Sequence, residues 1–149
     1  MIVAPDLGAV RLANRYATKL DLPVAVCHKR RLGGAEVSVA RITGDVSGRR
    51  CIIVDDMIST GGTIVEGVRA LNEAGALAEH IGAATHAVLV PGALDKIADA
   101  GVRALFVTDS IEPRVSSATR LTPTVVSVAP LLTTAIRRLL DGGSLRELA

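Results

Sequence analysis

Apolar and polar residues alternate along this chain with two different spacings. Short apolar runs are typical of strands, whereas apolar residues three or four positions apart, as at Leu12, Tyr16 and Leu20, are typical of a helix. The apolar runs predict strands at residues 2–4, 23–27, 36–43, 50–54, 81–90, 104–108 and 125–128. The helical spacing predicts helices at residues 11–20, 64–74, 94–99 and 131–140. Because strands and helices alternate, we expect an α/β fold, with a mostly parallel sheet flanked by helices.

Length and composition indicate a single domain over residues 1–149. A chain of 149 residues has the usual size of one domain, and 49% of its residues are apolar, which is enough to build a core. The 17 basic and 15 acidic residues leave a net charge of +2, so there is no basic excess to attract nucleic acid or a membrane surface. Aromatic side chains that would stack on bases are nearly absent, since the chain has one Tyr, one Phe and no Trp.

The cysteines and the apolar runs indicate the cellular compartment of the protein. Cys27 and Cys51 lie among apolar neighbours, where free cysteine is usually a buried structural residue, and no Cys-x-x-Cys pair indicates a metal or redox site. No apolar run reaches the ~18 residues of a membrane span, and the first residues do not resemble a secretory signal. We therefore expect a cytoplasmic protein with neither a nucleic-acid nor a membrane partner.

The segment from Val54 to Thr63 carries the clearest chemical signal. Its sequence, VDDMISTGGT, joins the end of an apolar strand to the start of a helix. Backbone amides at a helix start bind phosphate, with the positive end of the helix dipole behind them, and glycines let the backbone approach closely. Asp55 and Asp56 would repel a phosphate, but they suit the hydroxyls of a sugar beside it or a bridging Mg²⁺. The segment therefore predicts a sugar-phosphate site.

Simpler interpretations exist for several of these residues. Ser59 would merely cap the helix if Asp55 and Asp56 were solvated turn residues. Two adjacent acids before a hydroxyl-rich and glycine-rich turn are a much rarer combination than a single cap, and they favour the sugar-phosphate site. Elsewhere, the basic triplet Lys29–Arg31 is open to interpretation as a solvated charge run, and His86 as a structural histidine at a strand end.

The VDDMISTGGT segment resembles the phosphoribosyl pyrophosphate loop of the type I phosphoribosyltransferase superfamily. Further segments resemble the ribose-phosphate pyrophosphokinases of that superfamily. They are Pro5–Val10, His28–Arg31, Thr85-His86 with Thr108–Ile111, and Ser127–Arg138. These segments keep the family's order and spacing from one end of the chain to the other, and they match its carboxyl-terminal half. The resemblance implies a type I phosphoribosyltransferase-like fold.

The resemblance also implies a role for each matching residue. Asp55 and Asp56 would hold the 2- and 3-hydroxyls of ribose 5-phosphate. The turn would clasp the 5-phosphate through Ser59, Thr60, Gly61, Gly62 and Thr63. Asp6 would be a ligand of Mg²⁺, and the catalytic residues Lys29 and Arg31 would grip the transferring diphosphate of ATP.

The implied reaction is attack of the 1-hydroxyl of ribose 5-phosphate on the β-phosphorus of ATP, which gives phosphoribosyl pyrophosphate and AMP. Such a transfer is catalysed mainly by positioning and by neutralising spread negative charge. A basic loop and a metal ion are the tools expected for it.

Several features depart from the family's pattern. Ala9 replaces a glycine, His28 replaces an aspartate, and Ser59 stands where many members carry an aspartate. The family's enzymes are longer, and the half that does not match holds much of their adenine-binding surface. Two alternatives therefore stay open, a free-standing phosphoribosyltransferase that uses phosphoribosyl pyrophosphate as donor and a non-catalytic sugar-phosphate-binding regulatory subunit. The apolar last helix suggests a homo-oligomer or assembly with a full-length relative.

Overall fold

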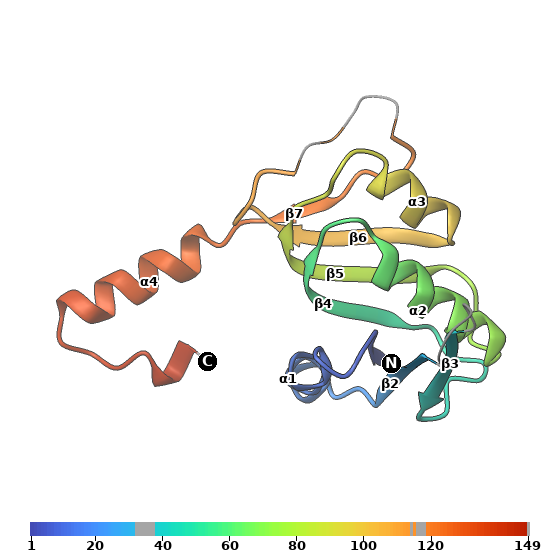
Figure 1. Ribbon diagram of the computed structural model, residues 1–149. Coiled ribbons are helices and arrows are strands. Elements are labelled where there is room, and N and C mark those ends of the chain that lie inside the picture. The colour runs from blue at the N-terminus through green and yellow to red at the C-terminus, as the bar shows by residue number, and fades with distance from the viewer. Residues whose placement is uncertain (32–37, 114, 116–118, 149) are drawn as a thin grey trace.

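Seven strands form one sheet in the computed structural model, which describes residues 1–31, 38–113, 115 and 119–148 (Figure 1). The strands are β1 (Ile2–Ala4), β2 (Val24–Arg31), β3 (Ser38–Thr43), β4 (Ile52–Ile58), β5 (His80–Ala87), β6 (Val102–Thr108) and β7 (Thr124–Val126). The helices are α1 (Val10–Leu20), α2 (Gly62–Glu73), α3 (Ala93–Asp99) and α4 (Ala129–Leu140), and the 3₁₀ turn η1 (Arg146–Leu148) follows them.

The sheet has the strand order β3-β2-β1-β4-β5-β6-β7. All neighbouring strands run parallel except β2 and β3, which pair antiparallel. The predicted α/β fold with a mostly parallel sheet is therefore confirmed. Because the parallel strands all point the same way, the loops that follow β1 and β4 emerge at one carboxyl edge of the sheet, where ligands bind in open α/β sheets.

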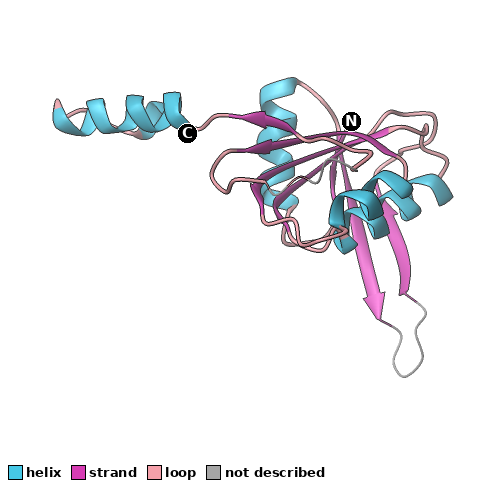
Figure 2. Ribbon diagram, turned by 90° about the horizontal axis from the view of Figure 1, so that it is seen from above, coloured by secondary structure: helices cyan, strands magenta, loops and turns pink. Residues whose placement is uncertain are grey.

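Helices α1, α2 and α3 cover the two faces of the sheet, over two separate apolar clusters (Figure 2). Ala9, Ala13 and Ala17 place α1 against Ile2 and Val54 on one face. On the other face, α2 and α3 cover the larger cluster, which includes Ile53 of β4. Small alanines on α1 let the helix approach the sheet closely, and branched residues fill the thicker layer beneath α2 and α3.

Strand boundaries differ from the predicted ones where a neighbouring strand continues the pairing. We expected β2 to end at Cys27 and a basic loop to follow, but β2 continues to Arg31 because its backbone pairs antiparallel with β3 as far as Ser38. We expected the strand before the acidic pair to end at Val54, but β4 continues to Ile58, opposite Ala87 of β5. Hydrogen bonding across the sheet outweighs the local polarity of these residues.

His80 joins the carboxyl end of α2 to the start of β5. The side chain is almost completely buried, and its Nε2 is 2.8 Å from Oδ1 of Asn72. Burial lowers the pKa of His80, so the ring is neutral at physiological pH. This contact lies at the opposite end of α2 from the loop that joins β4 to α2.

The last helix, α4, has no buried residue, and it extends away from the sheet beyond β7 (Figure 1). Among the residues that the structure describes, every helix is too short or too polar to cross a membrane.

Candidate functional site

The residues that the sequence singled out for ribose 5-phosphate line one hollow at the carboxyl edge of the sheet. The hollow has a volume of ≈ 250 Å³ and is formed by the continuous segment Asp55–Ile64 together with Asp6. Asp6 belongs to the loop after β1, which is the direct neighbour of β4 in the sheet. Strand order therefore brings Asp6 next to a loop 50 residues further along the chain.

Gly61 sets the shape of the turn between β4 and α2. Its φ is 74°, in the left-handed region that glycine adopts without strain. A Cβ atom at this position would lie 2.8 Å from Cγ1 of Ile97 and 3.3 Å from the carbonyl oxygen of Ala93, both on α3. The glycine is therefore required both by the backbone angle and by the close approach of α3.

The turn between β4 and α2 forms backbone hydrogen bonds with the segment after β5. The amide of Leu89 donates to the carbonyl of Ile58 at 3.0 Å, and the amide of Val90 donates to that of Ser59 at 3.1 Å. These bonds take up the carbonyl groups of Ile58 and Ser59. The amides of Thr63 and Ile64, in the first turn of α2, have no acceptor inside the helix, so they are available to an anion.

Ser59 does not cap α2. The N-cap residue is Gly61, without a side-chain cap, and the nearest side-chain contact is the Gly62 amide donating to Oγ1 of Thr60 at 3.3 Å. The interpretation of Ser59 as a simple helix cap is therefore wrong. Hydroxyl groups at residues 59, 60 and 63 line the hollow beside the free amides.

The two adjacent carboxylates differ in their surroundings. Asp55 is partly buried and its Oδ1 accepts the amide of Asp56 at 2.9 Å, whereas Asp56 is exposed. Burial raises the pKa of Asp55 to about 6, and the negative charges of Asp56 and Asp6 contribute further to the increase. A cationic group or a hydroxyl donor in the hollow would relieve this repulsion, which is what a sugar or a metal ion offers.

The acidic residues suit a Mg²⁺ ion that shares its ligands with a phosphate. Asp6 Oδ1 accepts the Ala9 amide at 3.1 Å, which orients the carboxylate in its loop. No group of three or more metal-binding side chains occurs in the described parts of the chain. Mg²⁺ typically binds one or two carboxylates, waters and substrate phosphates rather than a full protein cage, so a set of carboxylates of this size fits it.

Lys29 and Arg31 lie on β2, where their backbones pair with Ala40 and Ser38 of β3. Their side chains lie outside the described residues, as does the loop 32–37 between the two strands. Just before them, Nε2 of His28 lies 2.9 Å from Oγ1 of Thr43. The sequence placed the basic triplet in a loop, and the structure places its backbone in a two-stranded ribbon.

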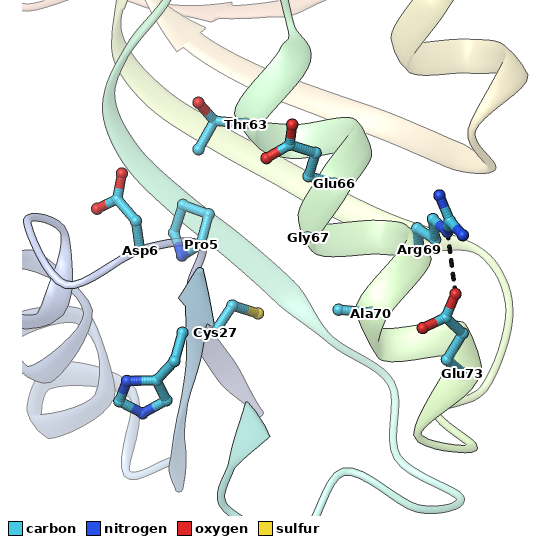
Figure 3. A pocket seen from close by; sticks show the side chains of 10 residues that line it. Pro5, Asp6, Cys27, Thr63, Glu66, Gly67, Arg69, Ala70 and Glu73 are labelled. Carbon is cyan, nitrogen blue, oxygen red and sulfur yellow. Dashed lines mark hydrogen bonds and ion pairs between the residues drawn. The ribbon is translucent and has the colours of Figure 1, made fainter. Parts of the chain in front are cut away.

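A second hollow of ≈ 150 Å³ adjoins the first along α2 (Figure 3). Asp6 and Thr63 line both hollows, and the second continues past Glu66, Arg69 and Glu73 of α2 toward Cys27. Arg69 and Glu73 form an exposed ion pair at 2.9 Å, which contributes little to stability. The sequence analysis missed these α2 residues, although their spacing of three and four places them on one helix face.

Lys96 on α3 is a further residue that the sequence analysis missed. Its Nζ would be 3.9 Å from a Cβ placed on Gly62, so the ammonium group lies close to the amino end of α2. A cation at this end of a helix opposes the helix dipole, and Lys96 forms no ion pair within the described residues. An anion bound at the turn would satisfy both groups. Nothing in the sequence pattern places α3 beside the turn.

The segments Thr85-His86 and Thr108–Ile111 do not line the hollow formed by Asp6 and Asp55–Ile64. Oγ1 of Thr108 donates to the Thr85 carbonyl at 2.7 Å, and Nδ1 of His86 lies 2.9 Å from Oγ of Ser110. These contacts tie the ends of β5 and β6 together. Asp109 Oδ1 accepts the Val128 amide at 2.8 Å, which fixes the start of α4, and hydrogen bonds from Ser127 and Val128 lower the pKa of Asp109.

Comparison with known proteins relates this geometry to one family. A family model described as phosphoribosyl transferase domain matches residues 1–108. A ribose-phosphate pyrophosphokinase of Streptomyces avermitilis is 40% identical over 149 residues, which are 99% of this chain and 45% of that protein. The corresponding protein of Maricaulis maris is 44% identical over 151 residues, 99% of this chain and 47% of that protein.

Solved structures agree with the sequence relatives. The crystal structure of phosphoribosylpyrophosphate synthetase from Mycobacterium smegmatis has a TM-score of 0.79 and 41% identity, covering 95% of this chain and 45% of that one. Orotate phosphoribosyltransferase from Aeropyrum pernix has a TM-score of 0.57 and 22% identity, covering 95% of this chain and 66% of that one, and shares the fold alone. The chain spans about half the length of the curated relatives it matches. The predicted resemblance and the type I phosphoribosyltransferase fold are confirmed.

We expect Gly61→Ala to destabilise the protein by about 2–4 kcal/mol, from the left-handed backbone and from overpacking against Ile97. Gly48→Ala is the matched control, because Gly48 has a φ of 64° and no atom within 4 Å of an added Cβ. That control should lose about 1 kcal/mol. Urea unfolding of both variants measures the difference, and equal losses would contradict the close packing at Gly61.

The raised pKa of Asp55 predicts a pH-dependent stability. Between the unfolded value of about 3.9 and the folded value of about 6, the folded state holds a proton that the unfolded state has lost. The free energy of unfolding should therefore fall as the pH rises from 4 to 7. Asp55→Asn keeps the acceptor for the Asp56 amide and removes the titration, so it should gain on the order of 1–2 kcal/mol over the wild type across this range. Parallel unfolding curves against pH would contradict this prediction.

Proposed function

This chain belongs to the phosphoribosyl transferase domain family, and from this membership we propose that it binds ribose 5-phosphate and phosphoribosyl pyrophosphate at residues 55–63. The observation that carries the proposal is the single hollow lined by two adjacent carboxylates, three hydroxyl residues and the amino end of α2. A monoester phosphate and a neighbouring pair of sugar hydroxyls match those two kinds of group.

The proposed binding mode follows from which groups donate hydrogen bonds and which accept them. The amides of the turn, with the hydroxyls of Ser59, Thr60 and Thr63, donate to the 5-phosphate oxygens. The carboxylates of Asp55 and Asp56 accept hydrogen bonds from the 2- and 3-hydroxyls. Sugar hydroxyls are neutral donors, so they lower the repulsion between the two acids without a new charge.

The proposed reaction is the diphosphate transfer of the ribose-phosphate pyrophosphokinases, which this chain resembles at about 40% identity. The 1-hydroxyl oxygen of ribose 5-phosphate bonds to the β-phosphorus of ATP, the bond from that phosphorus to the α-phosphate oxygen breaks, AMP leaves, and the hydroxyl proton passes to solvent. Lys29 and Arg31 hold the transferring diphosphate, and Asp6 holds Mg²⁺. The ion, when bound, neutralises phosphate charge.

This chain matches only part of its relatives, so only part of their chemistry is assigned to it. Because it covers 45% of the pyrophosphokinase from S. avermitilis, we assign to it the ribose phosphate, the metal ligand Asp6 and the basic ribbon. Recognition of adenine is assigned to the half that this chain does not match, whether a longer form of the protein or a full-length relative supplies it. A free-standing phosphoribosyltransferase would show turnover with phosphoribosyl pyrophosphate and a nucleobase instead of ATP.

Calorimetric titration with ribose 5-phosphate, phosphoribosyl pyrophosphate and ATP, each with and without Mg²⁺, tests the proposal. We expect ribose 5-phosphate to bind to the chain alone, and AMP to form faster from ATP when the chain is added to a full-length relative than when the relative acts alone. Release of pyrophosphate that depends on an added base would indicate the transferase instead. Failure of both sugar phosphates to bind would refute the proposed site.

The double variant Asp55→Asn with Asp56→Asn should lose ribose 5-phosphate affinity by at least about 100-fold, because hydrogen bonds to charged groups contribute ~1.5–3 kcal/mol each. Titration calorimetry measures the loss, and circular dichroism checks the fold. The matched control is Asp21→Asn with Asp141→Asn, which removes the same charge from exposed residues outside the hollow. An unchanged dissociation constant in the first variant would contradict the assigned role of the two acids.

Lys96→Gln should weaken ribose 5-phosphate binding about fivefold, as expected for ~1 kcal/mol from one exposed charge. Lys96→Arg should restore most of the affinity, since it keeps the positive charge near Gly62. Lys19→Gln, in the last turn of α1, removes an equal charge far from the turn and serves as the control. If both glutamine variants weaken binding equally, Lys96 acts through net charge alone and makes no contact with the phosphate.

A further inference from the structure

Leu89 has a backbone conformation that leucine rarely adopts. Its φ is 42°, in the left-handed region, where the Cβ atom of a bulky residue lies too close to the following carbonyl oxygen. Leu89 belongs to the segment between β5, which ends at Ala87, and α3, which begins at Ala93. A strained residue of this kind persists only where the surrounding structure holds it, and such residues cluster at functional sites.

The left-handed backbone turns two consecutive amides toward the same partner. The Leu89 amide donates to the carbonyl of Ile58 at 3.0 Å. The Val90 amide donates to the carbonyl of Ser59 at 3.1 Å. In a regular strand consecutive amides point to opposite edges, so only one of the two would reach this neighbour. Successive amides converge where the backbone passes through the left-handed region, so the φ of Leu89 makes this pair of hydrogen bonds possible.

The side chain of Leu89 anchors the same segment in the core. It is 3% exposed and belongs to the larger apolar cluster, together with Ile58 and Ala93. Glycine would adopt this φ without strain, but it would have no side chain to hold the segment in place. The Val90 carbonyl accepts the Ala93 amide at 3.0 Å, at the start of α3. The anchored segment therefore contacts both the turn after β4 and the helix that packs against this turn.

The two hydrogen bonds act on the turn that carries the proposed phosphate-binding groups. Ile58 is the last residue of β4, and Ser59 is the first residue of the turn that lines the hollow. Gly61, two residues further on, packs against Ile97 of α3. The turn is therefore held at its start by the segment after β5 and at its left-handed glycine by α3. Neither contact uses a hydroxyl group of the turn.

We propose that Leu89 is a positioning residue, whose strained backbone and buried side chain hold the β4–α2 turn in the shape that the 5-phosphate needs. The proposal rests on the proposed function and extends it to a residue that does not line the hollow. A turn that is already ordered loses less conformational freedom when a ligand binds, so it binds the ligand more tightly.

Calorimetric titration of ribose 5-phosphate into the Leu89→Val variant tests the role of this backbone, because a β-branched residue tolerates the left-handed region least. We expect the affinity to fall at least about fivefold. Leu89→Met keeps an apolar side chain of similar volume without branching at Cβ, and its affinity should stay within about twofold of the wild type.

Leu105→Val on β6 is the matched control. It removes the same methylene group from a residue of the same apolar cluster that is 1% exposed. Urea unfolding should show a loss of stability in both valine variants, because both remove buried apolar volume. Only Leu89→Val should lose affinity for ribose 5-phosphate, and a purely structural role of Leu89 would not produce this difference.

Hydrogen exchange in the ligand-free chain tests the same role without a ligand. Relative to the amides of β4, we expect the amides of residues 89 and 90 to exchange at least about tenfold faster in Leu89→Val, and at the wild-type rate in Leu105→Val. Wild-type affinity in Leu89→Val, an equal loss of affinity in Leu105→Val, or unchanged relative exchange at residues 89 and 90 would overturn the proposal. If the wild-type chain binds no sugar phosphate, the proposed function fails, and the exchange rates alone decide whether Leu89 holds the turn.

Discussion

The close contact between Gly61 and Ile97 is the constraint on which the functional site depends. A backbone that turns through the left-handed region can leave β4 and enter α2 within a few residues, and α3 packs directly against that turn. The Ile97 side chain fills the space beside Gly61, and the carbonyl groups of Ile58 and Ser59 accept hydrogen bonds from the segment after β5. The hollow is thus built on the packing between α2 and α3.

Charge is balanced across the hollow in two opposing groups. Asp6, Asp55 and Asp56 concentrate negative charge at one side, and burial keeps the pKa of Asp55 well above its ordinary value. The amino end of α2, with Lys96 close to Gly62, carries positive potential. A ligand with a phosphate at one end and hydroxyl donors at the other complements both groups at once. Such a pattern discriminates against a simple anion, which the acids would repel.

The β1–β4 part of the sheet and the β6–β7 part differ in how their faces are covered. Around β1 and β4, the sheet is covered on both faces and positions the binding loops. Around β6 and β7, one face is open and the last helix stands apart, although the contacts of Asp109 and Ser110 hold the strand ends firmly. The segments that resemble the family at Thr85-His86 and Thr108–Ile111 therefore support the frame, and they do not contact the phosphate hollow.

The sequence by itself determined the fold class, the order of the elements and the position of the loop between β4 and α2. Apolar periodicity located every helix to within a few residues, and the VDDMISTGGT segment identified the loop, because its chemistry is local and contiguous. Pairing between strands decided the rest. It extended β2 to Arg31 and β4 to Ile58, since hydrogen bonds from a neighbouring strand override the polarity of single residues. It also set Asp6 beside Asp55, and α3 packing set Lys96 beside Gly62. These contacts join residues far apart in the chain, and only the three-dimensional packing brings them together.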